Sequence, residues 1–118
     1  MLPSTTTLER KDIGASSRDR FVLAMDKAIE PIGDARNDFE IFRGLAKRLG
    51  THDVFTEGRE PEEWLRHIYD RARQSAAELD ITMPSYENFW DAGYLEIPSP
   101  SEPLVMFESF RRDPKANP

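Results

Sequence analysis

The chain has 118 residues, no cysteine and a formal net charge of −6, with 38% hydrophobic and 32% charged residues. This length and balance suit one folded domain with a modest core better than a disordered chain. The acidic charge argues against a nucleic-acid interface, which needs clustered Lys and Arg, and no apolar run approaches the roughly 20 residues of a membrane span. Without cysteine there is no disulfide framework and no thiolate metal site. We expect a soluble chain, in a compartment that the composition leaves open.

The first 20 residues predict an irregular polar arm. Three successive β-branched residues, Thr5, Thr6 and Thr7, favour extended backbone, and all four residues at 9–12 are charged. Residues 14–17 read Gly-Ala-Ser-Ser, which predicts a turn or a flexible loop. A self-contained small domain seldom begins this way, so the pattern indicates the interior of a larger protein.

The next segment mixes a short apolar run with the first predicted helix. Residues 21–25 fit a buried strand or a helix start, of which we favour the strand. Over residues 35–49 the apolar positions recur at three- and four-residue steps, which predicts an amphipathic helix that Gly50 ends. Its apolar positions are Phe39, Phe42, Leu45, Ala46 and Leu49.

Two further helices follow, and a third closes the chain. One begins near Pro61 and carries an apolar stripe as far as Leu79. A short one is capped by Ser85, ends at Gly93 and turns its aromatic residues inward. Residues 95–97 predict a brief strand, residues 98–103 a Pro-rich connector, and residues 104–112 a last helix. That helix would bury Leu104, Phe107 and Phe110.

The predicted fold class is therefore mainly α with minor β, a small helical unit with an irregular N-terminal arm. We divide the chain into the arm at residues 1–20 and a mainly helical part at residues 21–118. No catalytic constellation is predicted. The two histidines, His52 and His67, lack the spacing of metal ligands, and the aromatic residues recur at helical steps that predict core packing. We assign no catalytic residue and no metal ligand.

Two charged clusters are the candidate functional positions. The first is Glu9, Arg10, Lys11 and Asp12 on the irregular arm, where binding residues concentrate. The second is Arg36, Asn37 and Asp38 at the start of a helix. Either Asn37 or Asp38 can cap that helix, whereas the planar guanidinium of Arg36 suits a carboxylate or a phosphate. We expect Arg36 to form an ion pair that ties the arm to the helix.

These residues also carry a resemblance to a known family. The matching stretches are Leu2-Pro3-Ser4-Thr5-Thr6-Thr7-Leu8-Glu9-Arg10-Lys11-Asp12-Ile13-Gly14, Ala35-Arg36-Asn37-Asp38-Phe39, Phe55-Thr56-Glu57-Gly58-Arg59, Trp64, Phe89-Trp90 and residues 107–114. Together they resemble the dimethyl sulfoxide reductase family of molybdopterin oxidoreductases, and most closely its biotin sulfoxide, trimethylamine N-oxide and dimethyl sulfoxide reductases. The family usually reads Glu-Arg-Asn-Asp where this chain has a cation, Lys11, in the third place.

The resemblance implies an internal fragment of a larger α/β enzyme that reduces S-oxides or N-oxides. There a molybdenum bis(molybdopterin guanine dinucleotide) centre carries the oxygen-atom transfer, and its protein ligand lies upstream of this region. The fragment alone would hold no cofactor and would be inactive. We expect Thr7, Glu9, Arg10 and Asp12 to bind the cofactor or lie at a domain junction near it, while Arg36, Asn37 and Asp38 are structural.

The resemblance also implies partners and a source. The partner would be the remainder of the parent polypeptide, in the cytoplasm or periplasm of a bacterium, with no nucleic acid and no membrane span. An excised fragment can also self-associate through exposed apolar surface. The alternative is a non-catalytic helical scaffold or interaction module, for which the family likeness would say little about chemistry.

Overall fold

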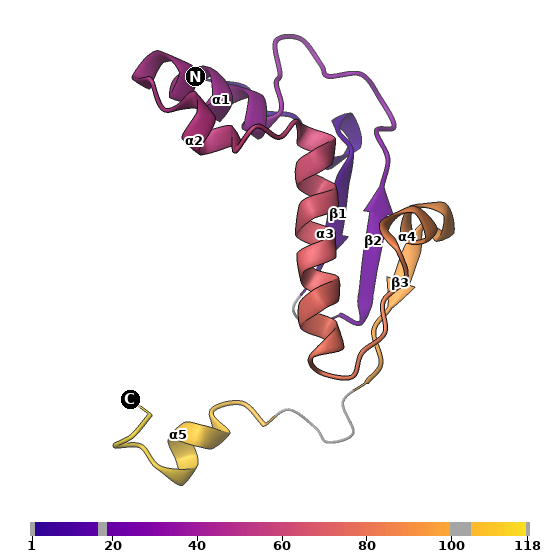
Figure 1. Ribbon diagram of the computed structural model, residues 1–118, viewed down its shortest axis with the longest axis vertical. Coiled ribbons are helices and arrows are strands. Elements are labelled where there is room, and N and C mark those ends of the chain that lie inside the picture. Colours follow the sequence, from indigo (N-terminus) through magenta and orange to yellow (C-terminus); the bar gives the residue numbers. More distant parts are fainter. Residues whose placement is uncertain (1, 17–18, 100–104, 118) are drawn as a thin grey trace.

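A computed structural model of the chain describes residues 2–16, 19–99 and 105–117 (Figure 1). In chain order the elements are the 3-10 turn η1 (Thr7–Glu9), β1 (Asp12–Ala15), β2 (Phe21–Met25), α1 (Asp38–Leu49), α2 (His52–Thr56), α3 (Pro61–Ala77), α4 (Tyr86–Ala92), β3 (Tyr94–Glu96) and α5 (Glu108–Arg112). The predicted class, mainly α with minor β, is confirmed. Helices α1 and α2 lie at one end of the molecule, α3 and the sheet form its middle, and α5 lies at the other end (Figure 1).

The three strands form one antiparallel sheet in the order β1-β2-β3. The strand predicted at residues 21–25 is confirmed as β2. The loop predicted at residues 14–17 is wrong at its start, because Gly14 and Ala15 belong to β1; Ser17 lies outside the described residues. Gly14 and the serines that follow the strand suggested a turn, yet the backbone pairs with β2 from Asp12 to Ala15. Each of these residues offers a backbone N–H and a carbonyl oxygen to the neighbouring strand.

The core lies where α3 and α4 meet the inner face of the sheet. Tyr69, Tyr86 and Phe89 are buried, and Phe89 is fully so, at 0% exposure. Tyr69 stacks on Phe89 with ring centroids 4.7 Å apart, and its hydroxyl donates a hydrogen bond to the Pro84 carbonyl oxygen over 3.1 Å. Half-buried side chains from both layers complete it: Ile13, Val22, Ala24, Leu65, Met83, Trp90 and Leu95. The inward aromatic residues predicted for α4 are confirmed.

Most helix ends lie where capping residues predict them. Helix α1 begins three residues later than predicted, because the Asn37 side chain accepts a hydrogen bond from the Phe39 N–H over 3.0 Å and so caps it. It ends at Gly50, whose φ of 72° is left-handed, as predicted. Helices α3 and α4 start at their predicted residues, and β3 lies one residue earlier than predicted. Helix α2 is not predicted by the sequence.

The buried face predicted for the last helix is wrong. Helix α5 has only five residues, and Phe107 and Phe110 are exposed, the former at 71%; Leu104 lies outside the described residues. Helix α5 lies apart from the other labelled elements in Figure 1, and its aromatic side chains stay exposed. Helix α1 behaves similarly, because Phe42, Leu45 and Leu49 are exposed and only Ala46 is buried. An amphipathic pattern predicts a helix without showing what covers it.

Candidate functional site

The N-terminal arm and the start of α1 are joined through their backbones. Ser4 and Arg36 form a parallel bridge, in which the Thr5 N–H donates to the Arg36 carbonyl oxygen over 3.0 Å. The Arg36 N–H in turn donates to the Pro3 carbonyl oxygen over 3.1 Å. The arm is thus tied to the helix at Arg36, but by the main chain. The expected Arg36 ion pair is not found: its exposed guanidinium has no ion pair with any residue that the structure describes.

Arg10 makes the charged contact that was expected of Arg36. Its Nε lies 2.8 Å from an Asp12 carboxylate oxygen, and its Nη1 donates to the Thr5 carbonyl oxygen over 3.0 Å. The same Nη1 is 3.7 Å from an Asp38 carboxylate oxygen at the start of α1. The forked guanidinium therefore links the arm, the first residue of β1 and the first turn of α1.

Glu9 is the buried carboxylate of the arm, at 4% exposure. Its Oε2 accepts hydrogen bonds from the Thr6 N–H over 2.7 Å and from the Thr6 hydroxyl over 2.8 Å. Its Oε1 accepts from the Ile32 N–H over 2.6 Å. The two Thr6 donors and the Ile32 amide hold the pKa of Glu9 below its ordinary value, although burial opposes them. Glu9 thereby fastens the arm to the segment that precedes α1.

Lys11, the residue that differs from the expected family pattern, connects the arm to α3 and α4. Its Nζ lies 2.8 Å from a Glu62 carboxylate oxygen and 4.2 Å from the centre of the Trp90 ring. The Glu62 hydrogen bond raises the Lys11 pKa above its ordinary value. The Trp90 Nε1–H donates to an Asp26 carboxylate oxygen over 2.9 Å. Lys11 thus contacts both α3 and α4.

These contacts surround a hollow of about 240 Å³ between the arm, α1 and α3. Its lining residues are Arg10, Lys11, Asp12, Asn37, Asp38, Phe39, Pro61, Trp64 and Leu65. Five residues of the two charged clusters are therefore brought together: Arg10, Lys11, Asp12, Asn37 and Asp38. Thr7, Glu9 and Arg36 are not among the lining residues. Trp64 and Leu65 were not predicted for the site, because they belong to the apolar stripe of a helix and nothing in the sequence relates that stripe to the arm.

The chemistry of this hollow is recognition of polar groups. Arg10 pairs with Asp12 and lies near Asp38, whereas Lys11 pairs with Glu62, and aromatic and aliphatic side chains complete the lining. No group of three or more His, Cys, Asp or Glu side chains that could hold a metal ion occurs in the described residues. His52 pairs with Asp53 at 2.9 Å, and His67 packs edge-on against Trp64 with ring centroids 5.6 Å apart.

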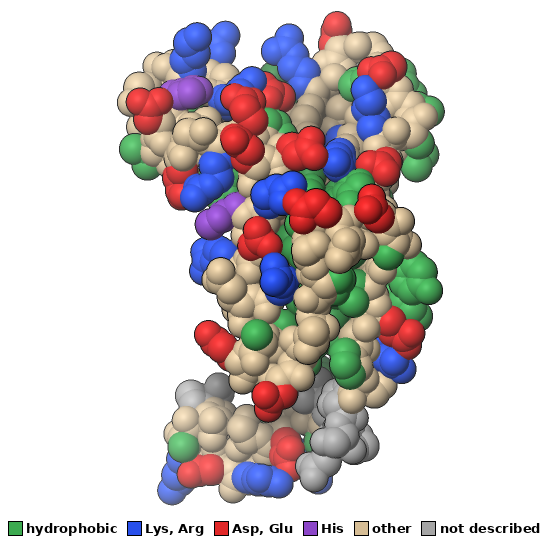
Figure 2. Space-filling model, turned by 45° about the vertical axis from the view of Figure 1, so that its right-hand side comes forward, with side chains coloured by type: hydrophobic (Ala, Val, Ile, Leu, Met, Phe, Trp, Pro, Cys, Tyr) green, Lys and Arg blue, Asp and Glu red, His purple; other side chains and the backbone are tan. Residues whose placement is uncertain are grey.

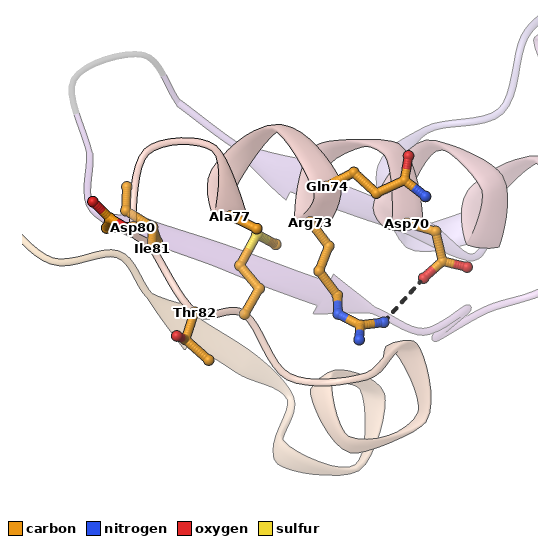
Figure 3. Close-up of a pocket in the computed structure, with 8 residues that line it drawn as sticks. Asp70, Arg73, Gln74, Ala77, Asp80, Ile81 and Thr82 are labelled. Atoms are coloured by element: carbon orange, nitrogen blue, oxygen red, sulfur yellow. Dashed lines mark ion pairs between the residues drawn. The ribbon is translucent and has the colours of Figure 1, made fainter.

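A larger hollow of about 620 Å³ lies beside the second half of α3 (Figure 3). Arg73 extends from α3 toward Asp70 on the same helix, 3.7 Å away, and Ile81 and Thr82 come from the loop after it (Figure 3). None of the residues predicted for the site lies here. No described helix is long and apolar enough to cross a membrane.

Comparison with known proteins agrees with the resemblance carried by the arm. The sequence pattern of the molybdopterin oxidoreductase family matches residues 1–48. The chain is 40% identical to biotin sulfoxide reductase of Cereibacter sphaeroides over 119 residues, which cover 100% of the chain and 16% of that protein. It is 40% identical over 121 residues to the dimethyl sulfoxide/trimethylamine N-oxide reductase of the same organism, covering 100% of the chain and 15% of the relative.

A third relative extends the comparison to another bacterium. Trimethylamine-N-oxide reductase of Pasteurella multocida is 39% identical over 117 residues, covering 98% of the chain and 14% of the relative. The chain therefore spans about one sixth of the length of these bacterial relatives or less. Because the similarity covers practically the whole chain in each case, this chain belongs to the molybdopterin oxidoreductase family, as a segment related to its biotin sulfoxide, dimethyl sulfoxide and trimethylamine N-oxide reductases.

Proposed function

We propose that the chain is an internal segment of a molybdenum-dependent reductase of S-oxides or N-oxides, and that it is inactive alone. The observation that carries the proposal is identity of about 40% along the whole chain to reductases of this kind. Within such an enzyme the segment serves as a rigid junction. Its arm, η1 and the start of α1 are fixed to each other by Glu9, Arg10 and the Arg36 backbone.

Some polar side chains of the arm are not engaged by other described residues, and they suit a cofactor with phosphate and amide groups. Thr5 is 6% exposed, and its hydroxyl oxygen is buried without a hydrogen-bond partner among the described residues. Thr7 and the guanidinium of Arg36 face outward nearby. A molybdenum bis(molybdopterin guanine dinucleotide) group would supply the two-electron oxygen-atom transfer. Thr7 would contact it, because its side chain is exposed on the arm.

Glu9, Arg10 and Asp12 have a different part in the same proposal. Their polar atoms are already engaged within the chain, Glu9 by three donors and Arg10 by Asp12 and the Thr5 carbonyl. They therefore act as positioning residues, holding the arm in the shape that exposes Thr7 and keeps the Thr5 hydroxyl buried. In this proposal the cofactor would lie close to Thr7, Glu9, Arg10 and Asp12, as the sequence predicts.

The alternative function is a non-catalytic interaction module. Exposure of Phe42, Leu45 and Leu49 on α1 is the observation that favours it, since an apolar helix face suits a partner protein. In that case the charged arm contributes only to folding. Molybdenum content separates the two functions, because only the reductase needs the metal.

The experiment uses the full-length polypeptide that contains this segment. Glu9→Ala and Arg10→Ala should lower molybdenum per chain and turnover of trimethylamine N-oxide or dimethyl sulfoxide. Glu78→Ala and Arg71→Ala are matched controls, because both side chains are exposed on or after α3, away from the arm. Unchanged molybdenum and turnover in the arm variants would return Glu9 and Arg10 to a purely structural role. A full-length protein that binds no molybdenum would refute the reductase assignment.

A further inference from the structure

Strand β2 is apolar on both faces of the sheet. Its five residues read Phe-Val-Leu-Ala-Met, and alternate side chains of a strand point to opposite faces. Val22 and Ala24 pack against the core formed with α3 and α4. Phe21, Leu23 and Met25 consequently point to the outer face, where Leu23 is 47% exposed although β2 is the central strand.

The neighbouring strands extend this apolar surface. Tyr94 of β3 is the register partner of Leu23, is 56% exposed, and has its ring centroid 6.1 Å from that of Phe21. Gly14 of β1 is the other register partner of Leu23, and a Cβ there would come within 2.7 Å of the Met25 sulfur. We define the outer sheet patch as Phe21, Leu23, Met25 and Tyr94. The absence of a side chain at Gly14 leaves room for the Met25 side chain to lie over β1.

The patch itself is uncharged. Figure 2 shows hydrophobic side chains gathered at mid-height along the right-hand side, whereas charged side chains of both signs crowd the upper half. None of the four patch residues carries a charge at neutral pH. Two charged residues border the patch in the register, and both are paired. Asp12, the partner of Met25, is paired with Arg10, and Glu96, the partner of Phe21, is paired with Arg20.

Such a strand is typical of a sheet covered on both sides. A sheet with one face in water alternates apolar and polar residues, whereas a strand buried on both faces is apolar throughout. Helices α3 and α4 supply one layer. Within the described residues no helix covers the other face, so the second layer has to come from elsewhere.

We propose that the outer sheet patch is an interior surface of the full-length polypeptide, covered by an apolar face of a segment outside these 118 residues. This inference rests on the proposed function, because it uses the relatives, of which this chain covers only 14–16%. A second copy of the chain is a poorer occupant. Four side chains make a patch far smaller than the roughly 1,200 Å² of total buried area that a stable protein interface needs. A segment of the same polypeptide is held nearby by the chain itself and does not need that area.

Cysteine labelling tests the proposal directly. The chain has no cysteine, so Leu23→Cys introduces one thiol at the centre of the patch, on the tryptic peptide that follows Arg20. The full-length protein is treated with a maleimide, and the labelled peptide is quantified by mass spectrometry. Arg71→Cys is the control, because Arg71 is exposed on α3, away from the patch. In the native protein we expect Leu23→Cys to react more slowly than in denaturant by at least about tenfold.

Two results would overturn the proposal. One is a native labelling rate at Leu23→Cys equal to that of the denatured protein, which would show that the patch is exposed. The other is protection that disappears on dilution, which would show that a second copy covers it. The readout uses neither molybdenum nor turnover. Protection in a protein without molybdenum would therefore uphold this inference and refute the proposed function, and labelling at full rate in an active reductase would do the reverse.

Discussion

Removal of the Arg10 guanidinium is the perturbation that most directly probes how the arm is held. In Arg10→Ala the buried Thr5 carbonyl loses its Nη1 donor, and Asp12 loses a contact of 2.8 Å. An unsatisfied buried acceptor costs about 1–3 kcal/mol, and a partly exposed ion pair contributes about 0–1 kcal/mol. The more distant Asp38 oxygen, at 3.7 Å, adds little. We therefore expect the free energy of detaching the arm to fall by about 2 kcal/mol, which raises the population of the detached arm by roughly 30-fold.

Amide hydrogen exchange measures this detachment locally. The Thr5 N–H is bonded to the Arg36 carbonyl oxygen, and the Ala28 N–H to the Leu8 carbonyl oxygen, so both report on the arm. Their exchange should accelerate by roughly 30-fold in Arg10→Ala. The Phe89 N–H, bonded within α4, should exchange at the wild-type rate. Arg10→Lys keeps the charge without the fork, so it should recover only part of the protection.

The control and the refuting result are equally specific. Arg71→Ala removes an exposed arginine from α3 and should leave the Thr5 and Ala28 amides unchanged. If Arg10→Ala accelerates the two arm amides no more than Arg71→Ala does, the guanidinium does not hold the arm. The proposal that Arg10 is a positioning residue would then be wrong.

Three further outcomes follow from the core and from the two titrating residues of the arm. Phe89→Ala should lower the free energy of unfolding in guanidinium by about 3–5 kcal/mol, and the exposed Phe110→Ala by much less; equal losses would contradict the core assignment. Hydrogen bonds hold the pKa of Glu9 in the folded protein below its ordinary value of 4.5. The stability that the Glu9 carboxylate contributes is therefore complete above the ordinary pKa and is lost as pH falls through the lowered pKa. Glu9→Gln should therefore flatten the acid limb of a stability–pH curve, and an unchanged limb would refute this. Lys11→Asn should lower the free energy of unfolding by about 1 kcal/mol, because it removes the ion pair with Glu62 and the cation–π contact with Trp90. The loss should be smaller in high salt, and a loss that does not change with salt would contradict this electrostatic origin.

The candidate site could be predicted only in part. The charged cluster of the arm and the residues at the start of α1 are visible as polar residues on irregular backbone and as a capping signal. Their convergence on one hollow is not visible, because the Ser4–Arg36 bridge and the Lys11–Glu62 ion pair join residues far apart in the chain. Arg36 shows the limit of prediction from residue type. Its side chain suggested an ion pair with the arm, whereas the structure joins it to the arm through its backbone.

The sequence by itself determined the family of this protein and most of its helix ends. Capping residues and apolar periodicity act within a few residues, so Asn37, Gly50, Pro61 and Gly93 place helix ends correctly. Only the tertiary structure decided what these elements cover. Strand β1 forms because β2 offers a backbone partner, and the helix predicted to bury Phe107 begins after that residue and leaves it exposed. Burial is a property of pairs of surfaces, and one surface of each such pair is remote in sequence or lies outside this chain.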